Sequence, residues 1–152
     1  MTGLSSPFSE IWSKCTKKID LDKINRRSTH TLVEHLGITI DEILPNGLKG
    51  SMPVDDRTVQ PYRMLHGGAS CVLAESLGSI ASNIIAIEND MIAVGQGINT
   101  QHLRPASEGR VYAIASFIHL GARSHVWNID IFDENNKIVS TSRLTMAIIK
   151  RN

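Results

Sequence analysis

The sequence has few cysteines and no large excess of charge, and these two absences exclude several classes of protein. Its 152 residues include only two cysteines, Cys15 and Cys71, in dissimilar contexts, so we expect no disulfide framework. Cys71 lies in an apolar stretch and is expected to be a buried thiol, which is typical of a reducing cytoplasm. The formal net charge of +1 argues against a general role on nucleic acid or on a membrane surface. We therefore expect a cytoplasmic protein with neither of these partners.

Leader, serine-hydrolase and metal motifs are also missing. The N-terminus, residues 1–7, has no basic segment followed by an apolar run and predicts no signal peptide. No Gly-x-Ser-x-Gly motif occurs, which disfavours a serine hydrolase. The six histidines have no cysteine-rich partner, and their scattered positions predict no metal site and no cofactor: His30, His35, His66, His102, His119 and His125.

What the sequence does contain is one long apolar stretch, residues 67–87, with Glu75 as its single charged residue. Large apolar residues recur in it at helical spacing and predict a helix with one face against a core: Leu73, Leu77, Ile80 and Ile84. The other faces are also poor in charge, so we expect this helix to be surrounded by protein. Its serines and glycines make a membrane span a poor explanation. Glu75 is costly to bury there unless its charge is held or used.

The rest of the chain predicts short helices followed by strands. Residues 7–36 predict three short peripheral helices, the second capped by Asp20 or Asp22, with a solvated basic face. Alternating segments flank a turn at residues 45–47, which is typical of a hairpin, and a loop over 55–64 leads to the long helix. The predicted strands cover 38–44, 48–54, 91–103, 110–120, 125–132 and 138–149.

This order of elements predicts an α+β fold in which a curved antiparallel sheet wraps one long central helix. We expect a single domain overall, made of an N-terminal helical extension over residues 1–36 and a main unit over residues 37–152. A curved sheet has open edges, and edge strands of two subunits can pair to cover them. At least a dimer is therefore expected.

Several short motifs after residue 36 sharpen this picture: Met52–Asp55, Gln60-Pro61, Leu65–Ser70, Leu73–Ser79, His102–Arg104, His119–Arg123, Trp127 and Ser142–Leu144. With them the sequence resembles the hotdog-fold acyl-CoA thioesterases that carry a catalytic glutamate on the central helix. The spacing from His66-Gly67-Gly68 to Glu75 is the most specific feature. The nearest groups hydrolyse 1,4-dihydroxy-2-naphthoyl-CoA in menaquinone biosynthesis, clear misacylated aryl carrier proteins, or hydrolyse 4-hydroxybenzoyl-CoA.

The resemblance implies roles for five residues in thioester hydrolysis. Glu75 would attack the carbonyl carbon and form an anhydride, or would activate a water, and both routes stay open. The Gly67 N–H, at a helix start, would polarise the thioester oxygen, with Gln60 and His66 around the same carbonyl. Ser79, four residues after Glu75, would position the water or the intermediate. Simpler explanations are a solvent-facing glutamate and small residues chosen for packing.

The resemblance also implies a binding site for coenzyme A or for an acyl carrier protein thioester. Arg104 and Arg123 are candidate phosphate contacts, because arginine binds phosphate in a bidentate way. Four further residues complete the predicted substrate-binding set: Gly68, His102, Gly121 and His125. The family fold leaves two alternatives: an acyl thioester dehydratase that uses a histidine and an acid, and a non-catalytic acyl-CoA-binding protein.

The spacing along the helix bears on the expected assembly. Glu75 follows His66 by nine residues, about 13 Å along a helix axis. One helix cannot easily bring both its start and its acid to one carbonyl. The resemblance accordingly implies that Glu75 and Ser79 of one subunit meet Gln60 and Gly67 of another, in a homodimer that is the minimal active unit of a homotetramer.

Overall fold

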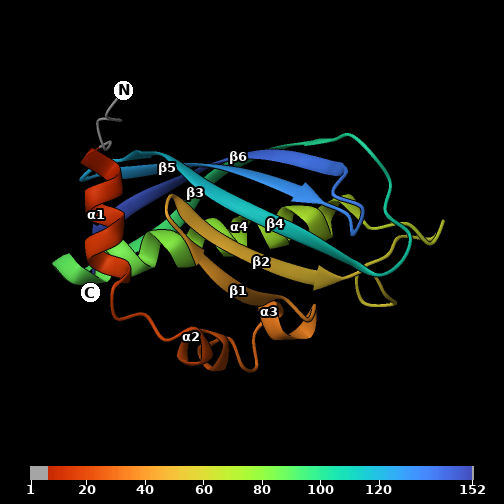
Figure 1. The fold of residues 1–152 in the computed structure, drawn as a ribbon, viewed down its shortest axis with the longest axis horizontal. Coiled ribbons are helices and arrows are strands. Elements are labelled where there is room, and N and C mark those ends of the chain that lie inside the picture. Colours follow the sequence, from red (N-terminus) through yellow and green to blue (C-terminus); the bar gives the residue numbers. More distant parts are fainter. Residues whose placement is uncertain (1–6, 152) are drawn as a thin grey trace.

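One long helix lies against a single six-stranded antiparallel sheet in this computed structural model, which describes residues 7–151 (Figure 1). Three short helices come first, namely α1 (Pro7–Thr16), α2 (Leu21–Arg27) and α3 (Leu32–His35). The hairpin β1 (Thr39–Leu44) and β2 (Gly47–Pro53) leads to the long helix α4 (Gly67–Ala86), which ends in a 3-10 turn over Ile87–Asn89. Strands β3 (Met91–His102), β4 (Arg110–Leu120), β5 (Ser124–Phe132) and β6 (Ile138–Lys150) follow. The predicted α+β arrangement is confirmed.

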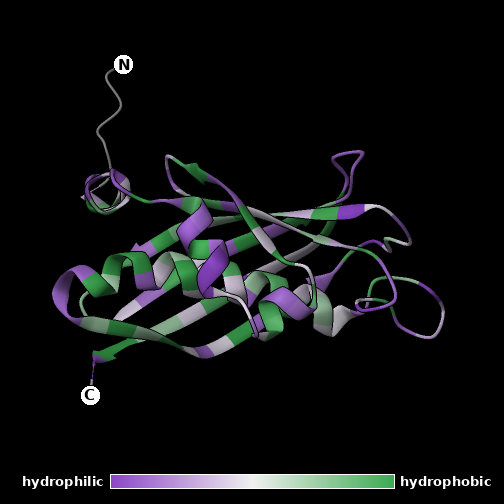
Figure 2. Ribbon diagram, turned by 90° about the horizontal axis from the view of Figure 1, so that it is seen from below, coloured by the Kyte–Doolittle hydropathy of each residue, from purple (hydrophilic) through white to green (hydrophobic). Residues whose placement is uncertain are grey.

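The order of strands in the sheet is β1-β2-β4-β5-β6-β3. After α4 the chain crosses to the far edge, where β3 pairs with β6 over its whole length and not with β4. The edge strands are therefore β1 and β3. Apolar and polar bands alternate along the strands, as a sheet with one face on a core requires (Figure 2).

The core lies between α4 and the concave face of the sheet. Leu73 and Leu77 of α4 are fully buried, as are Trp127, Ile129 and Ile131 of β5, which were predicted to share one face. The indole N–H of Trp127 donates to the hydroxyl of Ser82 on α4 at 2.7 Å. Helix and sheet are thus fixed to one another by packing and by a buried hydrogen bond.

In a single chain, α4 is less buried and α1 is more buried than the sequence predicts. Only about half of the apolar stretch Gly67–Asn89, which is long enough to cross a membrane by length and composition, is buried. Glu75 is exposed, and Cys71 is only half-buried, because the sheet covers one side of α4 and leaves the other side partly open. Conversely, α1 is less peripheral than expected, since Trp12 is 1% exposed and donates its indole N–H to the Leu44 carbonyl at 2.8 Å.

Candidate active site

The start of α4 carries a backbone N–H, that of Gly67, with no hydrogen-bond acceptor in residues 7–151. His66 is the N-cap residue, and its Nδ1 accepts the N–H of Gly68 at 2.8 Å. The N–H groups of Ala69 and Ser70 both donate to the His66 carbonyl, at 2.9 and 3.2 Å. Only the N–H of Gly67 is left over, at the end of the helix where the dipole is positive. This helix start can therefore stabilise an oxyanion.

Gly67 lines a cavity of about 360 Å³, hereafter the Gly67 cavity. Three other predicted site residues line the same cavity: Gln60, His102 and Arg104. The His102 ring lies directly over Gly67, because a Cβ atom at Gly67 would come within 2.8 Å of His102 Nε2. A side chain at Gly67 would therefore require the His102 ring to move.

Gln60 and His66 each have a polar hydrogen left to donate. The Gln60 side-chain oxygen accepts the N–H of Tyr62 at 2.7 Å, within a turn closed by Arg63 N–H on the Gln60 carbonyl at 2.8 Å. The Gln60 amide nitrogen is therefore free of this turn. In neutral His66, Nδ1 is an acceptor, so Nε2 carries the proton and is a donor. Gln60 lines the Gly67 cavity and can donate to a carbonyl oxygen there, whereas His66 is exposed at the helix start and does not line that cavity.

Glu75 lies eight residues farther along α4 than Gly67, about 12 Å along the axis. It lines a different cavity of about 330 Å³, hereafter the Glu75 cavity, together with Ser79 one turn on. The carboxylate rests against β3 at Gly95, where a side chain would collide with it and where the pairing of β3 with β6 shifts register. Within the described chain no hydrogen-bond donor or cation pairs with this carboxylate.

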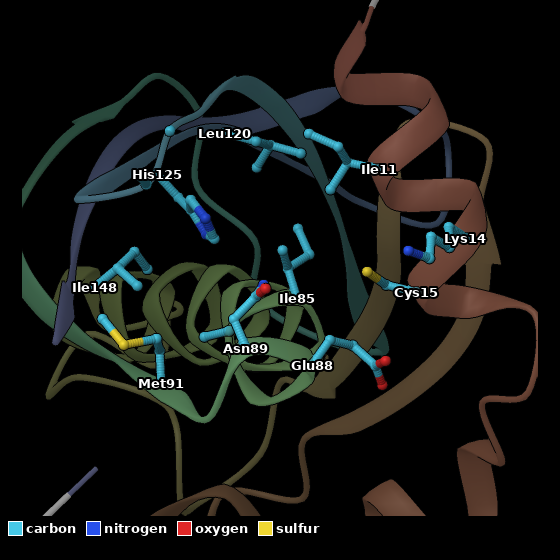
Figure 3. Close-up of a pocket in the computed structure, with 13 residues that line it drawn as sticks. Ile11, Lys14, Cys15, Ile85, Glu88, Asn89, Met91, Leu120, His125 and Ile148 are labelled. Carbon is cyan, nitrogen blue, oxygen red and sulfur yellow. The ribbon is translucent and has the colours of Figure 1, made fainter. Parts of the chain in front are cut away.

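The remaining predicted binding residues lie elsewhere. Gly68 is exposed beside Gly67, and Arg123 is exposed in the β4–β5 loop. Gly121 and His125 line a third cavity of about 570 Å³ at the C-terminal end of α4 (Figure 3). One chain thus brings together part of the predicted set at each end of the helix and does not assemble all of it.

His125 is 3% exposed, and its ring faces this third cavity beside Leu120 and Ile148 (Figure 3). Burial, helped by the nearby His119, lowers the pKa of His125 to about 4. The imidazole is therefore neutral at pH 7, and its Nδ1 has no hydrogen-bond partner in the described residues. A neutral, buried ring can contribute shape and polarity but no charge to a phosphate site. Of the four predicted binding residues outside the Gly67 cavity, Arg123 is therefore the one cation.

Sequence reasoning missed the residues that face Glu75 across its cavity. These come from α2, α3 and the turn between them: Arg27, Ser28, Thr31 and Val33. Their basic and polar pattern predicts a solvated face, and their distance from Glu75 in the sequence gives no signal of contact. In the part of the chain that the structure describes, no cluster of three or more metal-ligating side chains occurs.

Comparison with known proteins decides the family. A family model described as the thioesterase superfamily matches residues 62–140. The 1,4-dihydroxy-2-naphthoyl-CoA hydrolase of Escherichia coli strain K12 is 45% identical over 91% of this chain and 99% of its own length. The chain belongs to the thioesterase superfamily.

Solved structures agree with this assignment. A thioesterase from Haemophilus influenzae superimposes with a TM-score of 0.85 at 42% identity, over 89% of this thioesterase and 94% of the other chain. A variant of a thioesterase from Pseudomonas aeruginosa gives the same TM-score and identity, over 88% and 96% of the two chains. The hotdog fold expected from the motifs is confirmed, and this thioesterase is an enzyme that hydrolyses a thioester.

Proposed function

We propose that this thioesterase hydrolyses an acyl-CoA, and that its acyl group is an aryl group such as 1,4-dihydroxy-2-naphthoyl. The similarity to the E. coli hydrolase of that thioester, at 45% identity over nearly the whole chain, supports this choice. The observation that carries the proposal is the free N–H of Gly67, which opens into a cavity together with the Gln60 side chain. With this substrate the reaction would serve menaquinone biosynthesis in the cytoplasm.

The proposed site needs two subunits, and the two edges of the sheet differ in a way that supports one mode of pairing. At the β1 edge, the Asn25 side chain already accepts the N–H of Ile40 at 2.9 Å and donates to its carbonyl at 3.0 Å. The indole N–H of Trp12 donates to the Leu44 carbonyl of the same strand.

At the β3 edge the Asn83 side chain covers Ala93 in the same way, accepting its N–H at 2.9 Å and donating to its carbonyl at 3.0 Å. The β3 edge is nevertheless exposed over Val94–Gly97. The longer edge strand, β3, with 12 residues against 6 in β1 and with its exposed part beyond Ala93, favours pairing with a second copy.

Symmetric antiparallel pairing of β3 would bring the two parts of the site together. Glu75 rests on Gly95, and Gly67 lies under His102. If the two-fold axis falls between Ile98 and Asn99, then Gly95 lies opposite His102 of the partner subunit. The carboxylate of one subunit then faces the helix start of the other. We infer a homodimer as the minimal active unit, within the expected homotetramer.

In this dimer the Gly67 N–H and the Gln60 amide N–H would donate hydrogen bonds to the carbonyl oxygen and stabilise its developing negative charge. Glu75 of the other subunit would either add to the carbonyl carbon, giving an anhydride that water then opens, or take a proton from an attacking water. In both routes a C–O bond forms, the C–S bond breaks, and the thiolate of CoA leaves and takes up a proton. The net reaction consumes one water and yields acid and thiol. Ser79 would position the water.

Arg104 and His102 line the Gly67 cavity and would contact the pantetheine or phosphates of CoA. Gly121 and His125 line the cavity at the other end of α4, and Arg123 is exposed in the β4–β5 loop, so these residues would contact the CoA from another subunit or bind an acyl carrier protein thioester. The phosphate contacts would make KM sensitive to salt.

A turnover panel tests the proposal. Purified protein is incubated with benzoyl-, hydroxybenzoyl-, naphthoyl-, β-ketoacyl- and fatty acyl-CoA, and released thiol is followed with a thiol reagent. We expect the highest kcat/KM for aryl-CoA substrates. Faster turnover of a fatty acyl-CoA would contradict the aryl assignment, and bound CoA without thiol release would contradict hydrolysis of acyl-CoA.

A further inference from the structure

Two cavities run side by side along α4, and the N-terminal helices wall both of them. The first is the Glu75 cavity, and the second, of about 360 Å³, has five isoleucines among its ten lining residues, three of them from α2 and α4. Four residues line both: Arg27, Ser28, Ser79 and Ile80. Because they share these walls, we treat the two cavities as one acyl chamber that begins at Glu75 and continues past Ile80.

The chamber changes from polar to apolar along its length. Its mouth carries Glu75 and Ser79, whereas its far part carries Ile24 of α2 and Ile84 of α4, both partly buried, with Asn83 and the exposed Glu88 as the polar residues there. An acyl group whose carbonyl lies at Glu75 would extend its apolar body along this path. A flat aromatic ring or a short branched chain suits an apolar space between two helices.

The outer wall of the chamber is a fixed part of the fold. The Asn25 side chain makes two hydrogen bonds to the backbone of Ile40, at 2.9 and 3.0 Å, and so holds α2 on the edge of the sheet. Asp20 caps the start of α2 by accepting the N–H of Lys23 at 3.1 Å. The wall is therefore held by hydrogen bonds as well as by packing.

Arg27 lies at the junction between the polar and apolar parts of the chamber. In residues 7–151 neither a carboxylate nor a carbonyl accepts from its guanidinium. Arg26, the preceding residue, differs on both counts: it pairs with Asp20 at 3.8 Å and lines neither cavity. An unpaired guanidinium has five N–H donors to offer to an oxygen of a bound ligand.

The geometry points to Arg27 as a specificity-determining residue, within a chamber wall formed by residues 19–33. It would select acyl groups that carry a hydroxyl or another acceptor oxygen a few atoms from the thioester carbonyl, on an apolar aromatic body. The inference rests on the proposed acyl-CoA hydrolysis and assigns a role to the N-terminal helices that the family motifs do not give. A hydrogen bond to a charged group is strong enough to discriminate about tenfold between matched substrates.

The test compares benzoyl-CoA with its three monohydroxylated forms, in the wild type, in Arg27→Ala and in the matched control Arg26→Ala. We expect Arg27→Ala to lower the ratio of kcat/KM for the best hydroxybenzoyl-CoA to that for benzoyl-CoA by about tenfold. Arg26→Ala should keep the wild-type ratio. An unchanged ratio in Arg27→Ala, or an equal fall in both variants, would overturn the inference.

A second variant tests the wall itself. Ile24→Trp narrows the apolar end of the chamber, so kcat/KM for naphthoyl-CoA should fall several-fold more than that for benzoyl-CoA. Equal effects on the two substrates would overturn the assignment of the wall. A wild type that releases no thiol from any acyl-CoA would overturn the proposed function and this inference together, whereas an active wild type with insensitive variants overturns the inference alone.

Discussion

The role proposed for Gly67 depends on its backbone N–H and on its lack of a side chain. Its N–H is the one left over at the start of α4, and His102 occupies the space that a side chain would take. The backbone before it is extended, with φ −69° and ψ 131° at His66. Proline is tolerated after such a residue and at the first position of a helix, so the N–H can be removed without removing the helix.

Comparing Gly67→Pro with Gly67→Ala separates the effect of losing the N–H from the effect of adding a side chain. Both variants add a Cβ atom beside His102, but only proline deletes the N–H. We expect kcat for Gly67→Pro to lie about 100-fold below that for Gly67→Ala, as for the loss of one oxyanion donor. Equal kcat values in thiol-release assays would remove this N–H from the mechanism.

His125 makes stability depend on pH. Its pKa is near 6.5 in an unfolded chain but about 4 in the folded one, so between these values the unfolded state binds more protons. Stability should therefore be complete above about pH 6.5, fall as the pH falls, and have lost up to about 3 kcal/mol from this group below pH 4.

Urea denaturation of His125→Leu at pH 7 and pH 4.5 measures this effect. The variant should lose less stability between the two pH values than the wild type, while His35→Leu, at an exposed histidine, should behave as the wild type does. The same loss of stability in all three proteins would contradict the assignment to His125.

The elements show which structural features can be predicted from sequence and which cannot. Helical spacing in α4 and alternation in the strands arise from local periods, so the ends of nearly all elements lie within one or two residues of those predicted. The crossing of β3 to the far edge does not follow from any local period. The position of Arg27 beside Glu75 depends on how α2 packs on α4, and no local pattern encodes that either.

The attachment of α2 to the edge of the sheet can be tested by replacing Asn25. Replacing it with alanine removes two part-buried hydrogen bonds to Ile40, and we expect a loss of about 1–2 kcal/mol in the free energy of unfolding. Asn135→Ala, in the exposed turn between β5 and β6, should stay within about 0.5 kcal/mol of the wild type. Urea denaturation gives both values, and equal stability of the two variants would contradict the role of Asn25.

At the scale of the whole molecule, one chain places the proposed catalytic residues in two separate cavities. Gln60, Gly67 and His102 meet at one cavity, and Glu75 with Ser79 lies at another. The family motifs and the helix length predict this division, because a rigid helix fixes the distance between its own start and its own acid. They do not predict which edge of the sheet would pair in the proposed dimer. That depends on the side chains that cover each edge: Asn25 and Trp12 on β1, and Asn83 at Ala93 on β3.

The most direct test of a site shared between subunits mixes two inactive variants, Glu75→Gln and Gly67→Pro. Each should retain the fold but lose most turnover as a pure protein, whereas Glu42→Gln, at an exposed carboxylate on β1, should keep it. After random exchange of subunits, half of the dimers are mixed, and each holds one intact site and one doubly altered site. Thiol release should therefore recover to about a quarter of the wild-type rate. No recovery, with subunit exchange verified by mass spectrometry, would contradict the shared site.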